Sequence, residues 1–191
     1  MVEQVKGMTI DEFVRLYDQD GPFEFIEGER HPLSPTIAGH GSAASILFLA
    51  LGNLEKANGL GRVFIETAFV LEDIPGWVKG SRVPDLMFYR AERLIAYEAN
   101  MPDWKSKPFV LVPDLAVEIV SHTDRYSDVQ DKAELYLLDG VKIVWILDPQ
   151  RSRITIYSQN RKQQTILSAE DTLDGGEVIP GFKVAVVDIF A

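Results

Sequence analysis

The segment Pro113–Val120 constrains this chain most, because it is apolar except for Asp114 near its start and a glutamate close to its middle. Such a run predicts a buried strand. Burying a carboxylate costs several kcal/mol unless a cation, a metal ion or hydrogen bonds compensate for the lost water. Glu118 therefore predicts a partner for its charge inside the fold.

Periodicity along the rest of the chain predicts a single mixed α/β domain without internal repeats. The run Thr9-Ile10-Asp11-Glu12 has the form of a capping box, which predicts that a first helix begins there. We expect helices over residues 9–18, 42–57 and 124–138. Strands are expected over residues 23–27, 63–71, 83–89, 115–121, 141–147 and 154–157, followed by further short strands.

Composition limits the classes of function. The 191 residues suit one domain with a substantial core. No apolar stretch reaches the length of a membrane-spanning helix, and the N-terminus lacks an apolar secretory segment, so no membrane association is expected. The absence of cysteine rules out a disulfide framework and suits a cytoplasmic protein. The net charge of -10 argues against a general polyanion binder, so nucleic-acid binding would need a local basic patch.

A second acidic residue, Asp85, lies in another apolar segment expected to be a strand. If the two strands are neighbours, Asp85 and Glu118 bring two carboxylates to one divalent ion, which takes oxygen ligands. Asp114 is a poorer partner for Glu118, because four residues of strand separate them by about 13 Å. Asp85 and Glu118 are therefore the candidate metal ligands.

The helix expected over residues 124–138 supplies a cation. Lys132 lies at the border of its apolar stripe, where a lysine points inward or extends along the face. Its ammonium can therefore reach the carboxylates. Two interpretations of Glu118 remain open: a metal site with Asp85, or a buried ion pair with Lys132 or Arg82 that only fixes packing.

Several motifs occur together along the chain. They are Val83-Pro84-Asp85-Leu86, the segment Pro113–Ser121, the helix with Asp131, Lys132 and Tyr136, the segment Gly140–Pro149, Phe23–Glu29, His40, and Pro180-Gly181-Phe182. In these motifs the sequence resembles the Uma family of putative restriction endonucleases, which belongs to the PD-(D/E)XK nuclease superfamily. Each motif alone is weak, but the set is specific and spans nearly the whole chain.

The resemblance implies a restriction-endonuclease-like core, an α+β fold in which a mixed β-sheet is flanked by helices. Residues 1–191 would form one domain, with an N-terminal helical and hairpin part over 1–60 and a catalytic core over 61–191. The resemblance also implies a Mg²⁺-dependent site, with Mn²⁺ as a possible substitute, in which Asp85 and Glu118 bind the metal and act in catalysis. The chain departs from the superfamily at Val120, where the usual Glu-x-Lys pattern has its lysine, and Lys132 is the candidate replacement.

The implied chemistry follows from these residue types. A metal ion held by two carboxylates neutralises the scissile phosphate and acidifies a bound water. A lysine near that water can orient it, help to remove its proton or stabilise charge in the transition state. Glu24 is a further catalytic candidate, as an additional ligand or beside a second ion. The alternative for Glu24 is a solvent-facing strand residue.

Basic residues near the expected site are candidates for contacts with phosphate or DNA. They are His40, Lys79, Arg82, Lys105 and Lys107. The histidine precedes the second expected helix, whose N-terminus attracts anions, although a capping or surface role is the alternative. The other four lie in two expected loops, residues 77–82 and 104–107, that interleave aromatic and basic residues as in single-strand binding. Ordinary surface loops are the alternative.

These expectations combine into a metal-dependent endonuclease that hydrolyses DNA. A homodimer is a possible assembly, because many relatives are dimers and two sites would address two strands. The alternative is a catalytically inert nuclease-like module that binds nucleic acid or protein, suggested by the missing Glu-x-Lys and the net charge of -10. A two-carboxylate glycosidase is a weaker alternative, since nothing in the sequence indicates a sugar-sized cleft.

Overall fold

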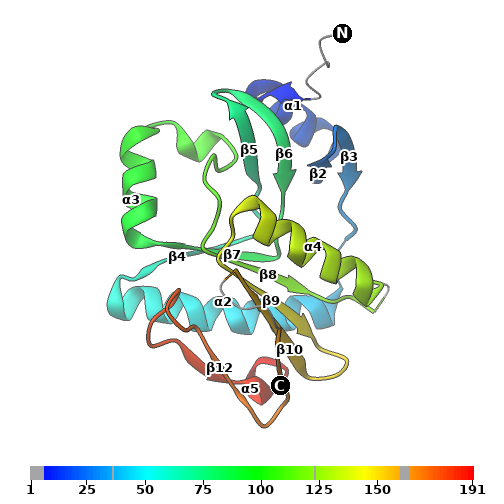
Figure 1. The fold of residues 1–191 in the computed structure, drawn as a ribbon, viewed down its shortest axis with the longest axis vertical. Coiled ribbons are helices and arrows are strands. Elements are labelled where there is room, and N and C mark those ends of the chain that lie inside the picture. Colours follow the sequence, from blue (N-terminus) through cyan, green and yellow to red (C-terminus); the bar gives the residue numbers. More distant parts are fainter. Residues whose placement is uncertain (1–6, 36, 123, 160–163) are drawn as a thin grey trace.

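A six-stranded mixed sheet forms the centre of the computed structural model, which describes residues 7–35, 37–122, 124–159 and 164–191 (Figure 1). The strands lie in the order β11 (Thr165–Leu167), β10 (Arg153–Ser158), β9 (Ile143–Asp148), β8 (Leu115–Ile119), β7 (Leu86–Arg90) and β4 (Gly61–Ile65). Strands β8 and β9 run parallel, and the other neighbours run antiparallel.

Helices cover both faces of this sheet, which explains why β8 is apolar along nearly its whole length. Leu115, Val117 and Ile119 of β8 pack in one core with α2 (Ala38–Asn58). Ala116, on the opposite face, packs in a second core with α4 (Tyr126–Asp139). Glu118 shares the face of Ala116 and so lies under α4. The predicted mixed β-sheet flanked by helices is confirmed.

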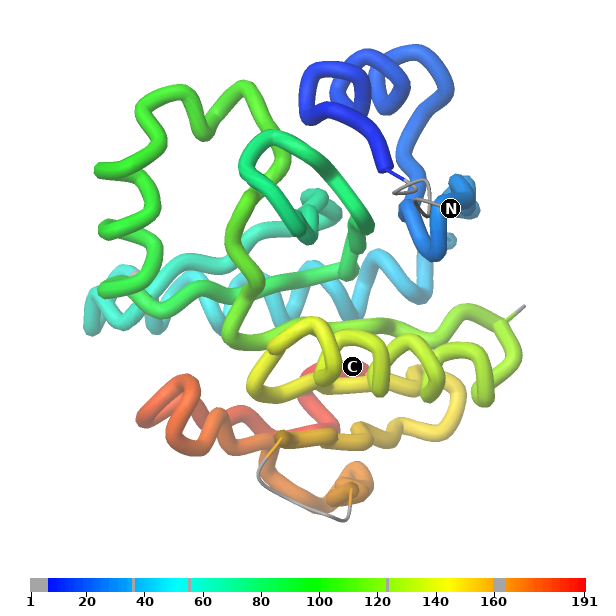
Figure 2. The backbone as a smooth tube through the Cα atoms, turned by 45° about the horizontal axis from the view of Figure 1, so that its top comes forward, coloured from blue at the N-terminus to red at the C-terminus, as the bar shows by residue number. Residues whose placement is uncertain are grey.

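A second sheet holds the N-terminal part of the chain, at the top of both views (Figure 1, Figure 2). Its strands are β1 (Met8–Thr9), β2 (Phe23–Ile26), β3 (Glu29–Pro32), β5 (Phe69–Ile74) and β6 (Trp77–Arg82), and β6 pairs with β1, β2 and β5. Helix α1 (Ile10–Asp20) packs against it. The hydroxyl of Thr9 accepts a hydrogen bond from the N–H of Glu12 at 3.1 Å, so the predicted N-terminal cap is confirmed.

The boundaries of three expected elements were wrong. The strand expected over residues 63–71 is two strands, β4 and β5, because Glu66 takes a positive φ of 42° and the chain passes from one sheet to the other. Residues 77–82, expected as a loop, form β6 in the centre of the second sheet. The strand expected over 83–89 begins at Leu86, so Asp85 precedes it.

The helices also differ in part from expectation. Helix α2 begins at Ala38, four residues before the expected start, and α4 begins two residues late, at Tyr126. Helix α3 (Ala91–Asn100) and a 3₁₀ turn at Trp104–Ser106 were not expected. The tail forms β12 (Thr172–Asp174), β13 (Lys183–Ala185) and α5 (Val186–Ile189), which complete the core on the α2 side. No helix of the described residues is long and apolar enough to cross a membrane.

Candidate active site

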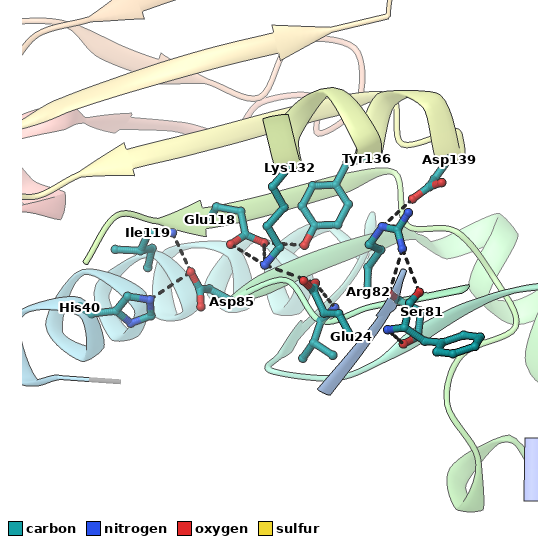
Figure 3. Close-up of polar contacts among 12 residues, drawn as sticks. Glu24, His40, Ser81, Arg82, Asp85, Glu118, Ile119, Lys132, Tyr136 and Asp139 are labelled. Carbon is teal, nitrogen blue, oxygen red and sulfur yellow. Dashed lines mark hydrogen bonds and ion pairs between the residues drawn. The ribbon is translucent and has the colours of Figure 1, made fainter. Parts of the chain in front are cut away.

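Side chains from both sheets and from α4 meet at Lys132 (Figure 3). Its ammonium Nζ lies 3.0 Å from Glu118 Oε1 and 3.3 Å from Glu24 Oε1. Glu118 lies on β8 of the central sheet, whereas Glu24 lies on β2 of the second sheet. Glu24 and Glu118 are 94 positions apart in the sequence, and the fold brings both to Lys132.

Glu118 is buried, and α4 provides its partners. The hydroxyl of Tyr136, one turn after Lys132 on α4, donates a hydrogen bond to Glu118 Oε1. Burial and the negative charges of Asp85 and Glu24 together raise the pKa of Glu118 to about 8, although Lys132 lowers it. The site therefore holds more negative charge than its lysine neutralises.

Lys132 remains protonated in this environment. Burial lowers its pKa, but the carboxylates of Glu118 and Glu24 raise it more, so the pKa lies above the usual value for lysine. A protonated ammonium donates hydrogen bonds and carries a positive charge, and it cannot accept a proton. Lys132 is therefore suited to stabilise negative charge.

Asp85 comes directly before β7 and reaches the backbone next to Glu118. Its Oδ2 accepts a hydrogen bond from the N–H of Ile119 at 2.6 Å and lies 3.0 Å from Nε2 of His40. His40 lies in the first turn of α2 and is buried. Burial lowers the pKa of His40, but the hydrogen bond to Asp85 and nearby carboxylates raise it more, so its pKa is raised overall.

The end of β6 and the segment that follows it set the positions of Glu24 and Asp85. The hydroxyl of Ser81 accepts the N–H of Phe25, which attaches β2 to β6. The N–H of Val83 donates to Glu24 Oε1 at 2.9 Å. Asp85 follows two residues later. One short stretch of chain thus orients Glu24 and presents Asp85.

The sequence matches a protein-family model over most of its length. A family model described as "Putative restriction endonuclease", Uma2, matches residues 10–187. The chain belongs to the Uma2 family. The resemblance stated from the sequence motifs is therefore confirmed.

A solved structure shares the fold of this Uma2 family member. It is the crystal structure of a putative nuclease belonging to DUF820 from Anabaena variabilis ATCC 29413. The TM-score is 0.76 at 20% sequence identity, covering 96% of this chain and 97% of that chain. No curated protein matches the sequence. The restriction-endonuclease-like fold expected from the sequence is thus supported by a nuclease-like neighbour.

Two alternatives for the sequence-predicted residues of this Uma2 protein are excluded by burial. Glu24 is 5% exposed and is not a solvent-facing strand residue. His40 is 8% exposed and is not a surface residue; it lies against Asp85. The structure therefore gathers Glu24, His40, Asp85, Glu118 and Lys132 in one region.

The four other basic candidates have different partners. Lys79 pairs with Asp73, and Lys107 with Asp103. The ammonium of Lys105 lies 5.6 Å from the ring centre of Trp104. Arg82 is buried and pairs with Asp139 at 2.9 Å, not with Glu118. The burial of Arg82 and its pairing with Asp139 argue against the expected DNA contact, which stays a prediction.

Asp114, at the other end of β8, has a separate set of partners. Its side chain is fully buried, and it pairs with Arg93 at 2.9 Å and with Lys142 at 2.6 Å. The N–H of Arg90 also donates to it at 2.9 Å. Asp114 therefore has compensation for its charge without a metal ion.

The donor set at Asp85 and Glu118 fits a hard divalent cation. Both residues offer carboxylate oxygens, and Mg²⁺ is commonly held by one or two carboxylates together with water and substrate phosphate. Within the described ranges no three histidine or acidic side chains are gathered closely enough to hold an ion by themselves. Burial and the charges of Asp85 and Glu24 raise the pKa of Glu118, and a bound cation would offset both effects.

Sequence reasoning missed two residues of this region. Tyr136 was named only among the motifs of the family resemblance, yet its hydroxyl contacts Glu118. Asp139 was given no role, yet it pairs with Arg82. Tyr136 and Asp139 lie four and seven residues after Lys132. This spacing, which places all three side chains on one face of the helix, is the signal that could have found them.

Proposed function

We propose that this protein is a metal-dependent endonuclease that hydrolyses DNA phosphodiester bonds. The observation that carries the proposal is the meeting of Asp85, Glu118 and Lys132 from separate elements, with Glu118 buried and Lys132 partly buried. A family described as restriction endonucleases supports DNA as the substrate. Paired carboxylates beside a lysine suit phosphate chemistry, because the ester carries negative charge in the ground state and more in the transition state.

Asp85 and Glu118 would hold Mg²⁺, or Mn²⁺ in its place. When bound, such an ion neutralises the scissile phosphate and lowers the pKa of a coordinated water. The N–H of Ile119 and the ring of His40 fix the Asp85 carboxylate. The hydroxyl of Tyr136 fixes the Glu118 carboxylate through its Oε1. These contacts keep both carboxylates oriented before substrate arrives, which reduces the reorganisation needed in the reaction.

Lys132 would act through its charge. Its raised pKa keeps the ammonium protonated at neutral pH, so the side chain donates hydrogen bonds to a phosphate oxygen and does not remove a proton from water. The two carboxylates at 3.0 and 3.3 Å hold the ammonium in place. Glu24 would therefore position Lys132, in addition to any contact with a second ion.

Cleavage of supercoiled plasmid DNA tests the proposal. We expect nicked or linear products with Mg²⁺ or Mn²⁺ and none after Asp85→Ala or Glu118→Ala, with circular dichroism showing that both variants stay folded. A matched control is Asp174→Ala, which removes an exposed carboxylate that pairs with Lys183 away from the site. Full cleavage by both site variants would remove these carboxylates from the mechanism.

Calorimetry combined with the cleavage assay separates the enzyme from the inert module. Isothermal titration calorimetry with Mn²⁺ should show binding to the wild-type protein and weaker binding to Glu118→Ala. Absence of both metal binding and cleavage, on single-stranded and double-stranded DNA, would favour a nuclease-like binding module. That module is the function suggested by the net charge of -10.

A further inference from the structure

A buried ion pair outside the carboxylate cluster attaches α4 to the second sheet (Figure 3). Arg82 Nε lies 2.9 Å from Asp139 Oδ2, and the two side chains are only 6% and 12% exposed. Arg82 is the last residue of β6, and Asp139 is the last residue of α4. The pair therefore links the end of the helix that carries Lys132 to a central strand of the other sheet.

The guanidinium of Arg82 also holds the strand that carries Glu24. Its Nη1 donates hydrogen bonds to the carbonyl oxygens of Ser81 at 3.0 Å and of Phe25 at 3.4 Å. Phe25 follows Glu24 directly on β2. A single side chain thus contacts the backbone beside Glu24 and the C-terminal end of α4.

Helix geometry makes this contact relevant to the lysine. Lys132, Tyr136 and Asp139 are spaced by four and three residues, which places them on one face of α4. Asp139 lies about 10 Å beyond Lys132 along the helix axis, at roughly 1.5 Å per residue. With Tyr136 held at Glu118 and Asp139 held at Arg82, α4 is fixed at two points along that face. Two points fix both its rotation and its sliding along the axis.

Burial offsets part of the stabilisation that this pair gives to the fold. Burial raises the pKa of Asp139 above its usual value, even though Arg82 lowers it. The ionised carboxylate is therefore less favourable in the folded chain than in water. Buried ion pairs of this kind can often be replaced by apolar side chains without loss of stability.

We propose that the Arg82–Asp139 pair is a positioning device that sets the ammonium of Lys132 between Glu24 and Glu118. Neither member of the pair contacts the reacting groups; the pair acts by docking α4. The inference rests on the proposed nuclease function, because the position of Lys132 matters only if the lysine serves the chemistry.

The first test replaces both partners by apolar side chains, Arg82→Met with Asp139→Leu. We expect kcat for plasmid cleavage with Mg²⁺ to fall by about 10- to 100-fold, since displacements of about 1 Å have effects of that size. KM for DNA should stay unchanged, and the midpoint of thermal unfolding should stay equal or rise. The control is Arg62→Met with Glu98→Leu, which removes an ion pair between β4 and α3 and should leave kcat unchanged.

A second readout does not depend on cleavage. In protein labelled with ¹⁵N-lysine, the ammonium signal that disappears in Lys132→Met identifies Lys132. That signal should shift in the Arg82–Asp139 double variant and not in the control. If the double variant does not fold, Asp139→Asn, which keeps the shape of the side chain, takes its place. The same fall in kcat and the same shift of the Lys132 signal are expected, but with a lower thermal midpoint, because Arg82 stays charged and buried.

The outcomes separate this inference from the proposed function. If wild-type protein cleaves DNA, unchanged kcat together with an unchanged Lys132 signal in the double variant overturns the positioning role. A fall in thermal midpoint with both kcat and the signal unchanged also overturns it, because the pair would then be structural. If wild-type protein does not cleave DNA, the proposed function fails, and a shifted Lys132 signal still supports the docking role.

Discussion

Two carboxylates at β8, Asp114 before the strand and Glu118 within it, should have opposite roles, and amide substitutions distinguish them. Asp114 comes directly before β8 and Glu118 lies within it, on the α4 side of the sheet. We expect Asp114→Asn to lose stability and keep DNA cleavage. We expect Glu118→Gln to stay folded and to lose cleavage by about 100-fold or more, the usual effect of removing a charged group from a reaction site.

The stability loss at Asp114 follows from its contacts. The fully buried carboxylate accepts the N–H of Arg90 and pairs with Arg93 and Lys142. A hydrogen bond to a charged group contributes about 1.5–3 kcal/mol. The side chains of Arg93 and Lys142 are 31% and 44% exposed, so they regain water when the charge is removed. We therefore expect Asp114→Asn to lower the free energy of unfolding by about 2–4 kcal/mol at pH 7.

The pH dependence of that loss has a definite sign. Burial raises the pKa of Asp114, but the hydrogen bonds from Arg90 and Lys142 and the charge of Arg93 lower it more, so the folded pKa is below the unfolded value. Such a carboxyl contributes stability above its unfolded pKa and loses it as the pH falls through the folded pKa. The difference between wild type and Asp114→Asn should be complete at pH 7 and should shrink below about pH 4.

Urea unfolding followed by circular dichroism measures this difference. With a slope of about 1–3 kcal/mol per molar, the midpoint of Asp114→Asn should fall by about 1–2 M at pH 7. The exposed Asp174 serves as control, since Asp174→Asn should change stability by no more than about 0.5 kcal/mol. A loss under about 1 kcal/mol for Asp114→Asn, or the same loss at pH 7 and at pH 3.5, refutes the reasoning. Loss of cleavage in Asp114→Asn would refute the separation of roles.

Three further predictions concern the site. Tyr136→Phe removes a hydrogen-bond donor from Glu118 and should weaken Mn²⁺ binding by about 10-fold or more in calorimetry; unchanged affinity would exclude an orienting role. His40→Gln should lower the rate of plasmid cleavage by about 10- to 100-fold, because Asp85 loses an ion-pair partner; a rate equal to wild type would count against that contact. EDTA should abolish cleavage and added Mn²⁺ should restore it, whereas cleavage that persists in EDTA would contradict metal dependence.

Local sequence patterns predicted the elements whose signal is local. The cap at Thr9 and the buried strand around Glu118 could be predicted, because neighbouring residues set them. The inward orientation of Lys132 also followed from its place at the edge of a helical stripe. In each case the decisive spacing lies within one helix or strand.

The elements that depend on distant partners could not be predicted in the same way. Residues 77–82 include Lys79, Gly80 and Ser81, a polar run that resembles a loop, and only pairing with β2 and β5 makes it a strand. The positive φ of Glu66 moves the chain between sheets, and no periodicity marks that position. The contact of Glu24 with Lys132 is missed for the same reason, since it joins two sheets.

The departure from the superfamily pattern at Val120 explains why docking contacts matter here. A lysine two residues after Glu118 would be placed by the strand itself, at a spacing of about 7 Å on the same face. In this chain Val120 instead packs in the core under α4, and the ammonium comes from Lys132 on that helix. The distance from ammonium to carboxylate is then set by how α4 lies on the two sheets. If the lysine were on β8, the Arg82–Asp139 pair would only pack α4 against the second sheet. Because the lysine is on α4, the same pair determines the geometry of the site.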